Sequence, residues 1–127
     1  MAAQSFTDLE VWRLADALDT EIYLLAKSLP ADETFRLADQ MIRAARAVPA
    51  NIAEGFGCYW PKRKVQFYEV GKASCGELMN HVLVAAEHQW CKDPKPLLDQ
   101  IDRLQRLLHR LILSTLDMPE PPGRYKP

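Results

Sequence analysis

The stretch "LLDQIDRLQRLLHRLILSTL", residues 97–116, decides the fold. Its apolar side chains recur at alternating spacings of four and three, which places them on one face of a helix. The residues of this face are Leu97, Ile101, Leu104, Leu108, Leu111 and Thr115. Neighbouring apolar positions widen the face at Leu98, Leu107, Ile112 and Leu116. A helix with so broad an apolar face is expected to pack against other helices.

Three upstream segments carry the same periodicity. Together with the last one, they predict helices over residues 8–29, 33–57, 61–91 and 94–116. Thr7 and Glu10 fit a capping box for the first helix, and Pro61 suits the first turn of the third. Because the connections are short, we expect an all-α fold, an up-down-up-down antiparallel four-helix bundle over residues 1–117. Residues 118–127 are rich in proline and are expected to form a flexible tail.

The second predicted helix contains "RAARAVPANIAEG", residues 43–55, with a proline at position 49. A proline inside a helix removes a hydrogen bond and costs ~3 kcal/mol, so we expect a kink. The predicted apolar side of this helix comprises Phe35, Ala38, Ile42, Ala45, Val48, Ile52 and Phe56. Beside it runs a polar line of Arg36, Gln40, Arg43, Ala47, Asn51 and Glu54. From its geometry alone we interpret this line as a solvated face; the alternative is a seam against another helix or subunit.

Two aromatic residues of the first predicted helix share a face. Trp12 and Tyr23 are three turns apart, and this face is rotated away from the main apolar line. They lie either at the margin of the core or on a surface between subunits, where Trp and Tyr are enriched. Together with the broad apolar face of the fourth helix, they favour a homo-oligomer.

The composition is that of an ordinary soluble domain. The 127 residues carry a net charge of −1, so any affinity for nucleic acid must come from a local patch. The three cysteines are widely spaced, which favours free thiols in a reducing compartment. Neither a signal peptide nor an apolar run long enough to span a membrane is present in the sequence. We expect a cytoplasmic protein that does not bind membranes.

The sequence contains few groups suited to catalysis. It lacks the Glu-x-x-His signature of di-iron bundles and the phosphate-binding glycine motifs. Glu77 and His81 share a helix face, and we interpret them as a surface ion pair. An alternative is a small-molecule-binding or hydrolytic site around Asn51, Glu54, Glu77 and His81. We expect no enzyme activity, no catalytic residue, no cofactor and no metal site.

One segment has features of a nucleic-acid contact. In "CYWPKRKVQFY", residues 58–68, the cations Lys62, Arg63 and Lys64 stand between aromatic residues. Cations bind phosphates, and aromatic rings stack on bases. The alternative is a solvated loop whose aromatic rings cover the end of the bundle. If RNA or DNA binds, the candidate residues are Arg43, Arg46, Lys62, Arg63 and Lys64.

Several pieces of the chain resemble the family of 23S ribosomal RNA intervening-sequence proteins: "DLEVW", "RAARAVPANIAEG" and "GKASCGEL". This resemblance implies a four-helix bundle that assembles into a homopentamer, with a suggested role in nucleic-acid binding. It extends to the accessory proteins of diversity-generating retroelements, which are strongly basic, whereas this chain is near neutral. The resemblance also implies that the motif residues form a structural and subunit-contact seam: Gln40, Arg43, Asn51, Glu54 and Gly55. The function it implies is a non-enzymatic oligomeric scaffold for nucleic acid or a nucleic-acid-associated protein.

Overall fold

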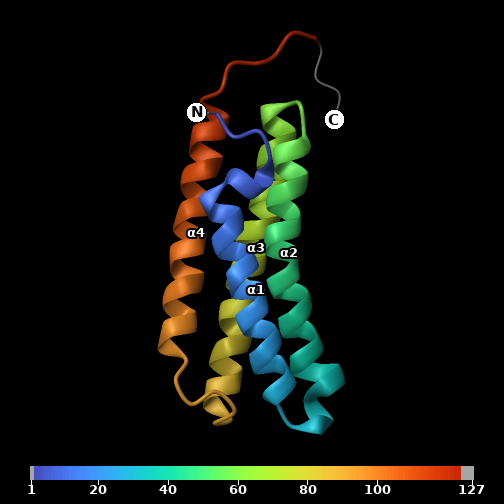
Figure 1. Ribbon diagram of the computed structural model, residues 1–127, viewed down its shortest axis with the longest axis vertical. Coiled ribbons are helices and arrows are strands. Elements are labelled where there is room, and N and C mark those ends of the chain that lie inside the picture. The colour runs from blue at the N-terminus through green and yellow to red at the C-terminus, as the bar shows by residue number, and fades with distance from the viewer. Residues whose placement is uncertain (1, 124–127) are drawn as a thin grey trace.

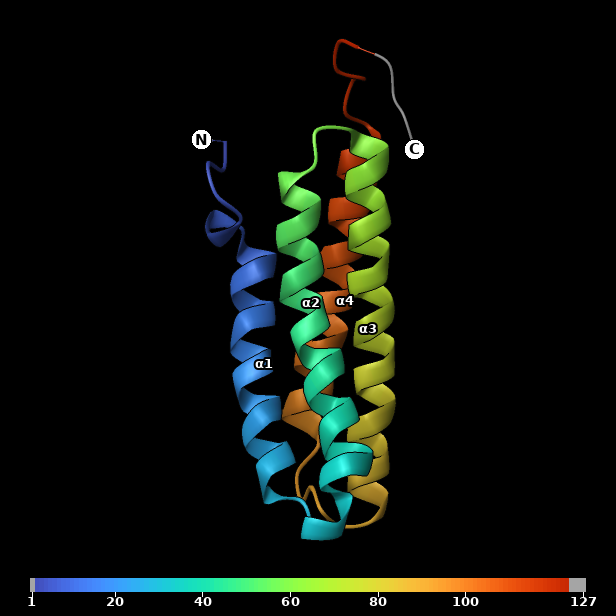
Figure 2. The ribbon, with the colours of Figure 1, turned by 90° about the vertical axis from the view of Figure 1, so that its right-hand side faces the viewer.

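The structure, a computed structural model, describes residues 2–123. Within them the protein contains no strand, and its long helices are α1 (Glu10–Ser28), α2 (Asp39–Gly57), α3 (Pro61–Glu87) and α4 (Lys95–Leu116). The four helices lie side by side along one axis, and successive helices run in opposite directions (Figures 1 and 2). This arrangement confirms the predicted all-α four-helix fold. None of the described helices is long and apolar enough to cross a membrane.

The chain enters α1 through a short 3-10 turn, Phe6–Asp8. The capping box belongs to this turn: the Thr7 amide donates to the Ser5 hydroxyl oxygen, and the Ser5 amide donates to the Asp8 carboxylate, both at 3.2 Å. The predicted box of Thr7 and Glu10 is therefore wrong, because Ser5 and Asp8 offer the same spacing two residues earlier. Helix α1 begins at Glu10, after an extended Leu9 that provides no side-chain cap.

The entry to α2 also differs from the prediction. A 3-10 turn (Ala31–Glu33) is followed by a π-helical turn (Thr34–Ala38) before α2 begins at Asp39. A π turn changes the rotation per residue, so the 3.6-residue pattern does not apply across it. Leu37, Ala38 and Met41 are buried, whereas Phe35 is 92% exposed. The prediction that Phe35 lines the core is wrong for the single chain.

Helix α2 continues without interruption through its internal proline. Pro49 is buried between the buried residues Val48 and Ile52. One turn away, the side-chain Nδ2 of Asn51 donates to the Ala47 carbonyl oxygen at 2.7 Å. Pro49 lacks the backbone N–H group that would continue the hydrogen bonding of the helix, but its ring is buried in the bundle. The helix does not divide into two elements at this residue.

Helix α3 ends at Glu87, four residues before the predicted end. The Trp90 amide donates to the Ala85 carbonyl oxygen at 2.9 Å, and the Gln89 amide donates to that of Ala86 at 3.0 Å. These two bonds form a Schellman motif, with Gln89 in the left-handed region at φ 63°. Glycine is the usual residue at this position, so the sequence carried no clear stop signal there.

The core runs along the bundle axis and draws on all four helices. Its largest inaccessible side chains include Leu18, Ile22, Met41, Ile52, Leu78, Ile101, Leu104 and Leu108. The apolar face predicted for α4 is confirmed at Ile101, Leu104, Leu108 and Thr115, while Leu97 and Leu111 lie at its margin. The described part of the proline-rich tail, residues 118–123, follows α4 and crosses the end of the bundle (Figure 1). Residues 124–127 of the predicted tail lie outside the described residues.

Candidate functional site

The motif glycine of α2 marks a close approach of two helices. A Cβ atom on Gly55 would lie 2.5 Å from Cε1 of Tyr68 and 3.1 Å from the Lys64 carbonyl oxygen. One turn further along, Gly71 of α3 faces Asn51, and a Cβ there would lie 3.6 Å from that of Asn51. Burial raises the pKa of the Tyr68 hydroxyl to about 12, in agreement with the 3% exposure of this residue. Gly55 therefore has a packing role at the α2–α3 contact.

The remaining motif residues of α2 lie mostly in solvent. Gln40, Arg43 and Glu54 are exposed, whereas Asn51 is half-buried against α3. Arg43 binds Asp39 across one helical turn, with Nε and Oδ2 3.1 Å apart. In a single chain this line is thus available to a partner, and its role as a subunit-contact seam stays a prediction.

The two aromatic residues of α1 have different surroundings. Trp12 is half-buried, packs against the core and contacts the ring of Phe6 edge-on, with centroids 5.2 Å apart. Tyr23 is 39% exposed. The cationic groups of Lys27 and Arg46 each lie 5.8 Å from the Tyr23 ring centroid. Arg46 is therefore held at the α1–α2 flank of its own chain.

Arg46 also lies near the carboxylate of Asp19, which is partly buried. Oδ1 of Asp19 is buried and has no hydrogen-bond partner. Burial raises the pKa of Asp19, the positive charge of Arg46 opposes that rise, and the negative charge of Asp16 adds to it. The α1–α2 flank thus combines charged and aromatic groups.

The triplet of cations at the start of α3 is divided by the structure. Nζ of Lys64 donates to the carbonyl oxygens of Phe56 at 2.8 Å and Gly55 at 3.4 Å. These carbonyls belong to the end of α2, where unpaired carbonyl groups attract a cation. Burial lowers the pKa of Lys64. Lys64 therefore caps α2 and is not a free surface cation.

Lys62 and Arg63 remain on the surface at the corner between α2 and α3. Lys62 forms an exposed ion pair with Glu120 at 3.6 Å. The Arg63 guanidinium donates to the Gln66 side chain at 3.2 Å and lies 5.3 Å from the centroid of the Phe67 ring. The two aromatic residues that precede α3, Tyr59 and Trp60, meet edge-on with centroids 5.1 Å apart.

The five candidate nucleic-acid residues do not form one patch in a single chain. Arg43 is twelve residues before Gly55 on α2, which is about 18 Å along the helix axis. Lys62 and Arg63 lie at the corner beyond Gly55, and Lys64 points back to α2. Lys62 and Arg63 are exposed neighbours at the α2–α3 corner, whereas Arg43 and Arg46 lie on the exposed side of α2.

The residues proposed for a small-molecule site are also spread out. Nε2 of His81 lies 3.3 Å from Oε1 of Glu77, as expected for the predicted pair, but His81 is largely buried. Asn51 faces Gly71, which precedes His81 by ten residues, about 15 Å along α3. Across residues 2–123, no three His, Cys, Asp or Glu side chains are grouped so that they hold a metal ion. This geometry gives the hydrolytic alternative no support.

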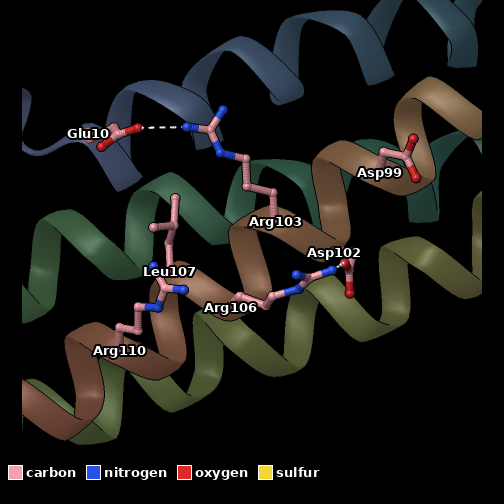
Figure 3. A pocket seen from close by; sticks show the side chains of 7 residues that line it. All are labelled: Glu10, Asp99, Asp102, Arg103, Arg106, Leu107 and Arg110. Carbon is pink, nitrogen blue, oxygen red and sulfur yellow. Dashed lines mark hydrogen bonds and ion pairs between the residues drawn. The ribbon is translucent and has the colours of Figure 1, made fainter.

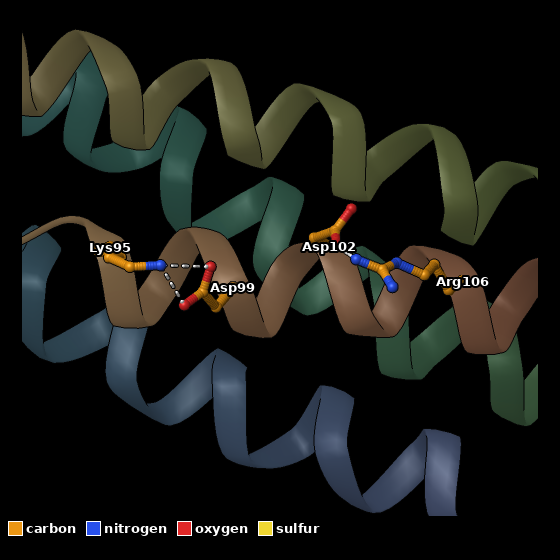
Figure 4. A network of polar contacts seen from close by, with 4 residues as sticks. All are labelled: Lys95, Asp99, Asp102 and Arg106. Atoms are coloured by element: carbon orange, nitrogen blue, oxygen red, sulfur yellow. Dashed lines mark hydrogen bonds and ion pairs between the residues drawn. The ribbon is translucent and has the colours of Figure 1, made fainter.

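A charged groove on α4 was missed from the sequence. Its lining residues are Glu10, Asp99, Asp102, Arg103, Arg106, Leu107 and Arg110, around an open volume of 520 Å³ (Figure 3). Arg103 reaches Glu10 of α1 at 2.8 Å, and Arg106 binds Asp102. Lys95 binds Asp99 one turn earlier at 3.1 Å (Figure 4). The spacing of Arg103, Arg106 and Arg110 in the sequence indicates one face of a helix. Three carboxylates balance the charge of these arginines, so the sequence shows no excess of positive charge there.

The fold and these sites define a helical-bundle protein in which one motif residue, Gly55, serves the packing of α2 against α3. The chain belongs to the family described as 23S rRNA-intervening sequence protein, which it matches over residues 7–110. The match contains α1, α2 and α3 and most of α4, so it covers the bundle. No curated protein matches the chain.

Proposed function

We propose that the protein is a non-enzymatic, cytoplasmic, homo-oligomeric scaffold that binds nucleic acid or a nucleic-acid-associated protein. Membership in the intervening-sequence protein family supports the scaffold role. The proposal includes kinship with the accessory proteins of diversity-generating retroelements, for which the "RAARAVPANIAEG" resemblance is the support.

The observation that carries the oligomer is the exposure of large apolar side chains on a single chain. Phe35 is 92% exposed and Leu24 is 63% exposed. Phe35 also borders a hollow of 200 Å³ between the end of α1 and the start of α2, lined in part by Leu29 and Ile42. Exposed apolar groups beside a hollow favour association with another protein surface. A head-to-tail contact that closes forms a ring, and the family resemblance makes five subunits our choice.

The α2–α3 corner supports the nucleic-acid part of the proposal. Lys62 and Arg63 are exposed, and the aromatic residues Tyr59 and Trp60 directly precede α3, which begins at Pro61. Lysine and arginine bind phosphates, and exposed rings stack on unpaired bases. In a ring of subunits the corner is repeated, so weak single contacts add along one strand.

A titration of labelled single-stranded RNA and DNA at two salt concentrations tests this function. We expect sequence-tolerant binding that weakens with salt, because phosphate contacts release counterions. A K62A/R63A variant should bind more weakly and with a shallower salt dependence, by up to about two ions in the slope. Lys64 is left unchanged because it caps α2.

The matched control is K92A/K95A, which removes the same charge at the opposite end of the bundle, near the α3–α4 connection (Figure 1). It should bind as the wild type does. Equal losses in the two variants would indicate a general charge effect. Absence of wild-type binding at low salt would contradict the nucleic-acid function.

A further inference from the structure

The chain after α4 returns to the α2–α3 corner and contacts it at three points. The Glu120 carboxylate lies 3.6 Å from Nζ of Lys62. The Tyr59 hydroxyl donates to the Pro122 carbonyl oxygen at 3.2 Å. Gly123 lies against the Trp60 ring, so close that a Cβ atom on it would be 3.3 Å from Cη2. Each contact involves a different residue of the corner, so the position of the tail depends on three separate interactions.

The chemistry of both partners suits the recognition of a proline-rich segment. The segment Met118–Gly123 reads "MPEPPG", and its prolines restrict the backbone before binding, which lowers the entropy lost on ordering. Protein surfaces that bind such segments present aromatic rings to them. Here Tyr59 and Trp60 supply the rings, the Tyr59 hydroxyl supplies the hydrogen-bond donor, and Lys62 complements the acidic residue within the segment.

We propose that the corner of Tyr59, Trp60 and Lys62 is a binding surface for an acidic proline-rich segment, and that residues 118–123 are its resident ligand. An external nucleic acid that uses these same residues must displace the segment. This competition rests on the proposed function, whereas the binding of the segment does not. The tail then acts as a tethered competitor for the corner.

The contacts are suited to exchange. The Lys62 and Glu120 side chains are 64% and 61% exposed, and an ion pair so exposed contributes little to stability. The single hydrogen bond from Tyr59 is also on the surface. A tethered segment needs little intrinsic affinity, because its effective concentration at the corner is high. A multivalent nucleic acid can therefore replace it.

The test compares full-length variants. Glu120→Gln removes the carboxylate that faces Lys62, and a triple variant adds P121G and P122G to loosen the segment. Asp117→Asn is the matched control, because it removes the same charge from the same end of the chain at the residue that follows α4. Two measurements are made: nuclear magnetic resonance of the Trp60 indole and Tyr59 ring, and affinity for labelled single-stranded RNA at low salt.

We expect the Trp60 and Tyr59 resonances to shift in the triple variant and to stay in place in the control. RNA affinity should rise about threefold with E120Q and about tenfold with the triple variant, since each lost contact removes part of the competition. Unchanged resonances in the triple variant would overturn the binding surface. Equal RNA affinities for E120Q and D117N would overturn the competition.

The two proposals fail in different ways. Shifted resonances without RNA binding by any variant would sustain the segment-binding surface and contradict the nucleic-acid function. If the wild type binds RNA but the resonances of the triple variant are unchanged, the nucleic-acid function is supported. The proposal that residues 118–123 bind to the corner is then contradicted.

Discussion

The contact between α2 and α3 and the contact between α1 and α4 are filled differently. At the first, Tyr68 lies so close to Gly55 that a methyl group on the Cα atom of Gly55 would collide with the Tyr68 ring. At the second, Glu10 and Arg103 meet in solvent, with side chains 67% and 61% exposed, above an open groove. Small residues fix the geometry of one flank, whereas charged residues with weak mutual attraction line the other. Gly55, which lies in the segment "RAARAVPANIAEG", thus belongs to the more closely packed of the two flanks.

The largest effect is expected at Gly55. In Gly55→Ala the new methyl group would lie 2.5 Å from Tyr68, a buried ring, and 3.1 Å from a backbone oxygen. Overpacking of this kind costs about 1–3 kcal/mol, so we expect a loss of about 2 kcal/mol in the free energy of unfolding. Urea denaturation at a fixed protein concentration measures it.

Gly57→Ala is the control for this substitution. Gly57 lies two residues further along the same helix, and a Cβ there meets nothing within 4 Å. We expect it to be neutral or stabilising by less than about 1 kcal/mol. If G55A changes the free energy of unfolding as little as G57A does, the stability of the fold does not depend on the close contact between α2 and α3.

The α3–α4 contact allows an intermediate test. Gly76 is an exposed helical glycine, and a Cβ on it would lie 3.5 Å from the flexible end of the Gln105 side chain. Because this is an ordinary contact distance, Gly76→Ala should raise the free energy of unfolding by about 0.5–1 kcal/mol through better helix propensity. If thermal or urea denaturation shows that Gly76→Ala lowers the free energy of unfolding, the α3–α4 contact is packed as tightly as the α2–α3 contact.

The smallest effect is expected at the α1–α4 flank. A double-mutant cycle of Glu10→Gln and Arg103→Ala should give a coupling energy below about 0.5 kcal/mol, since both side chains are mostly exposed. Salt should reduce that coupling further. A coupling well above about 1 kcal/mol would remove the contrast between the two flanks.

The sequence predicted best those features that depend on a regular helical period. The start of α4 is one residue from its predicted place and its end agrees, because Pro94 and an unbroken apolar spacing define them. The start of α2 was predicted less well, because a π turn shifts the phase and moves Phe35 out of the core. The end of α3 depends on Gln89 in a conformation that glycine usually adopts.

The candidate sites were predictable only where the direction of a side chain follows from its helix. The sequence grouped Lys62, Arg63 and Lys64, but Lys64 turns toward the end of α2, and this depends on how two helices meet. The seating of Glu120 and Pro122 on the corner joins residues about sixty positions apart, which no local pattern reports. The arginine face of α4 was visible in the spacing, yet its pairing with Glu10 of α1 was not.

The proposed closed homo-oligomer can be tested by light scattering across micromolar concentrations. We expect a constant mass near five times the 14.5 kDa of one chain, and a smaller mass for Phe35→Asp, because a charge would replace the exposed ring. Asn80→Asp alters the charge by the same amount on the exposed side of α3, away from the predicted subunit contacts, and it separates a lost apolar contact from a change in net charge. A wild-type mass of 14.5 kDa at every concentration would show that the protein is a monomer and would rule out the homo-oligomer.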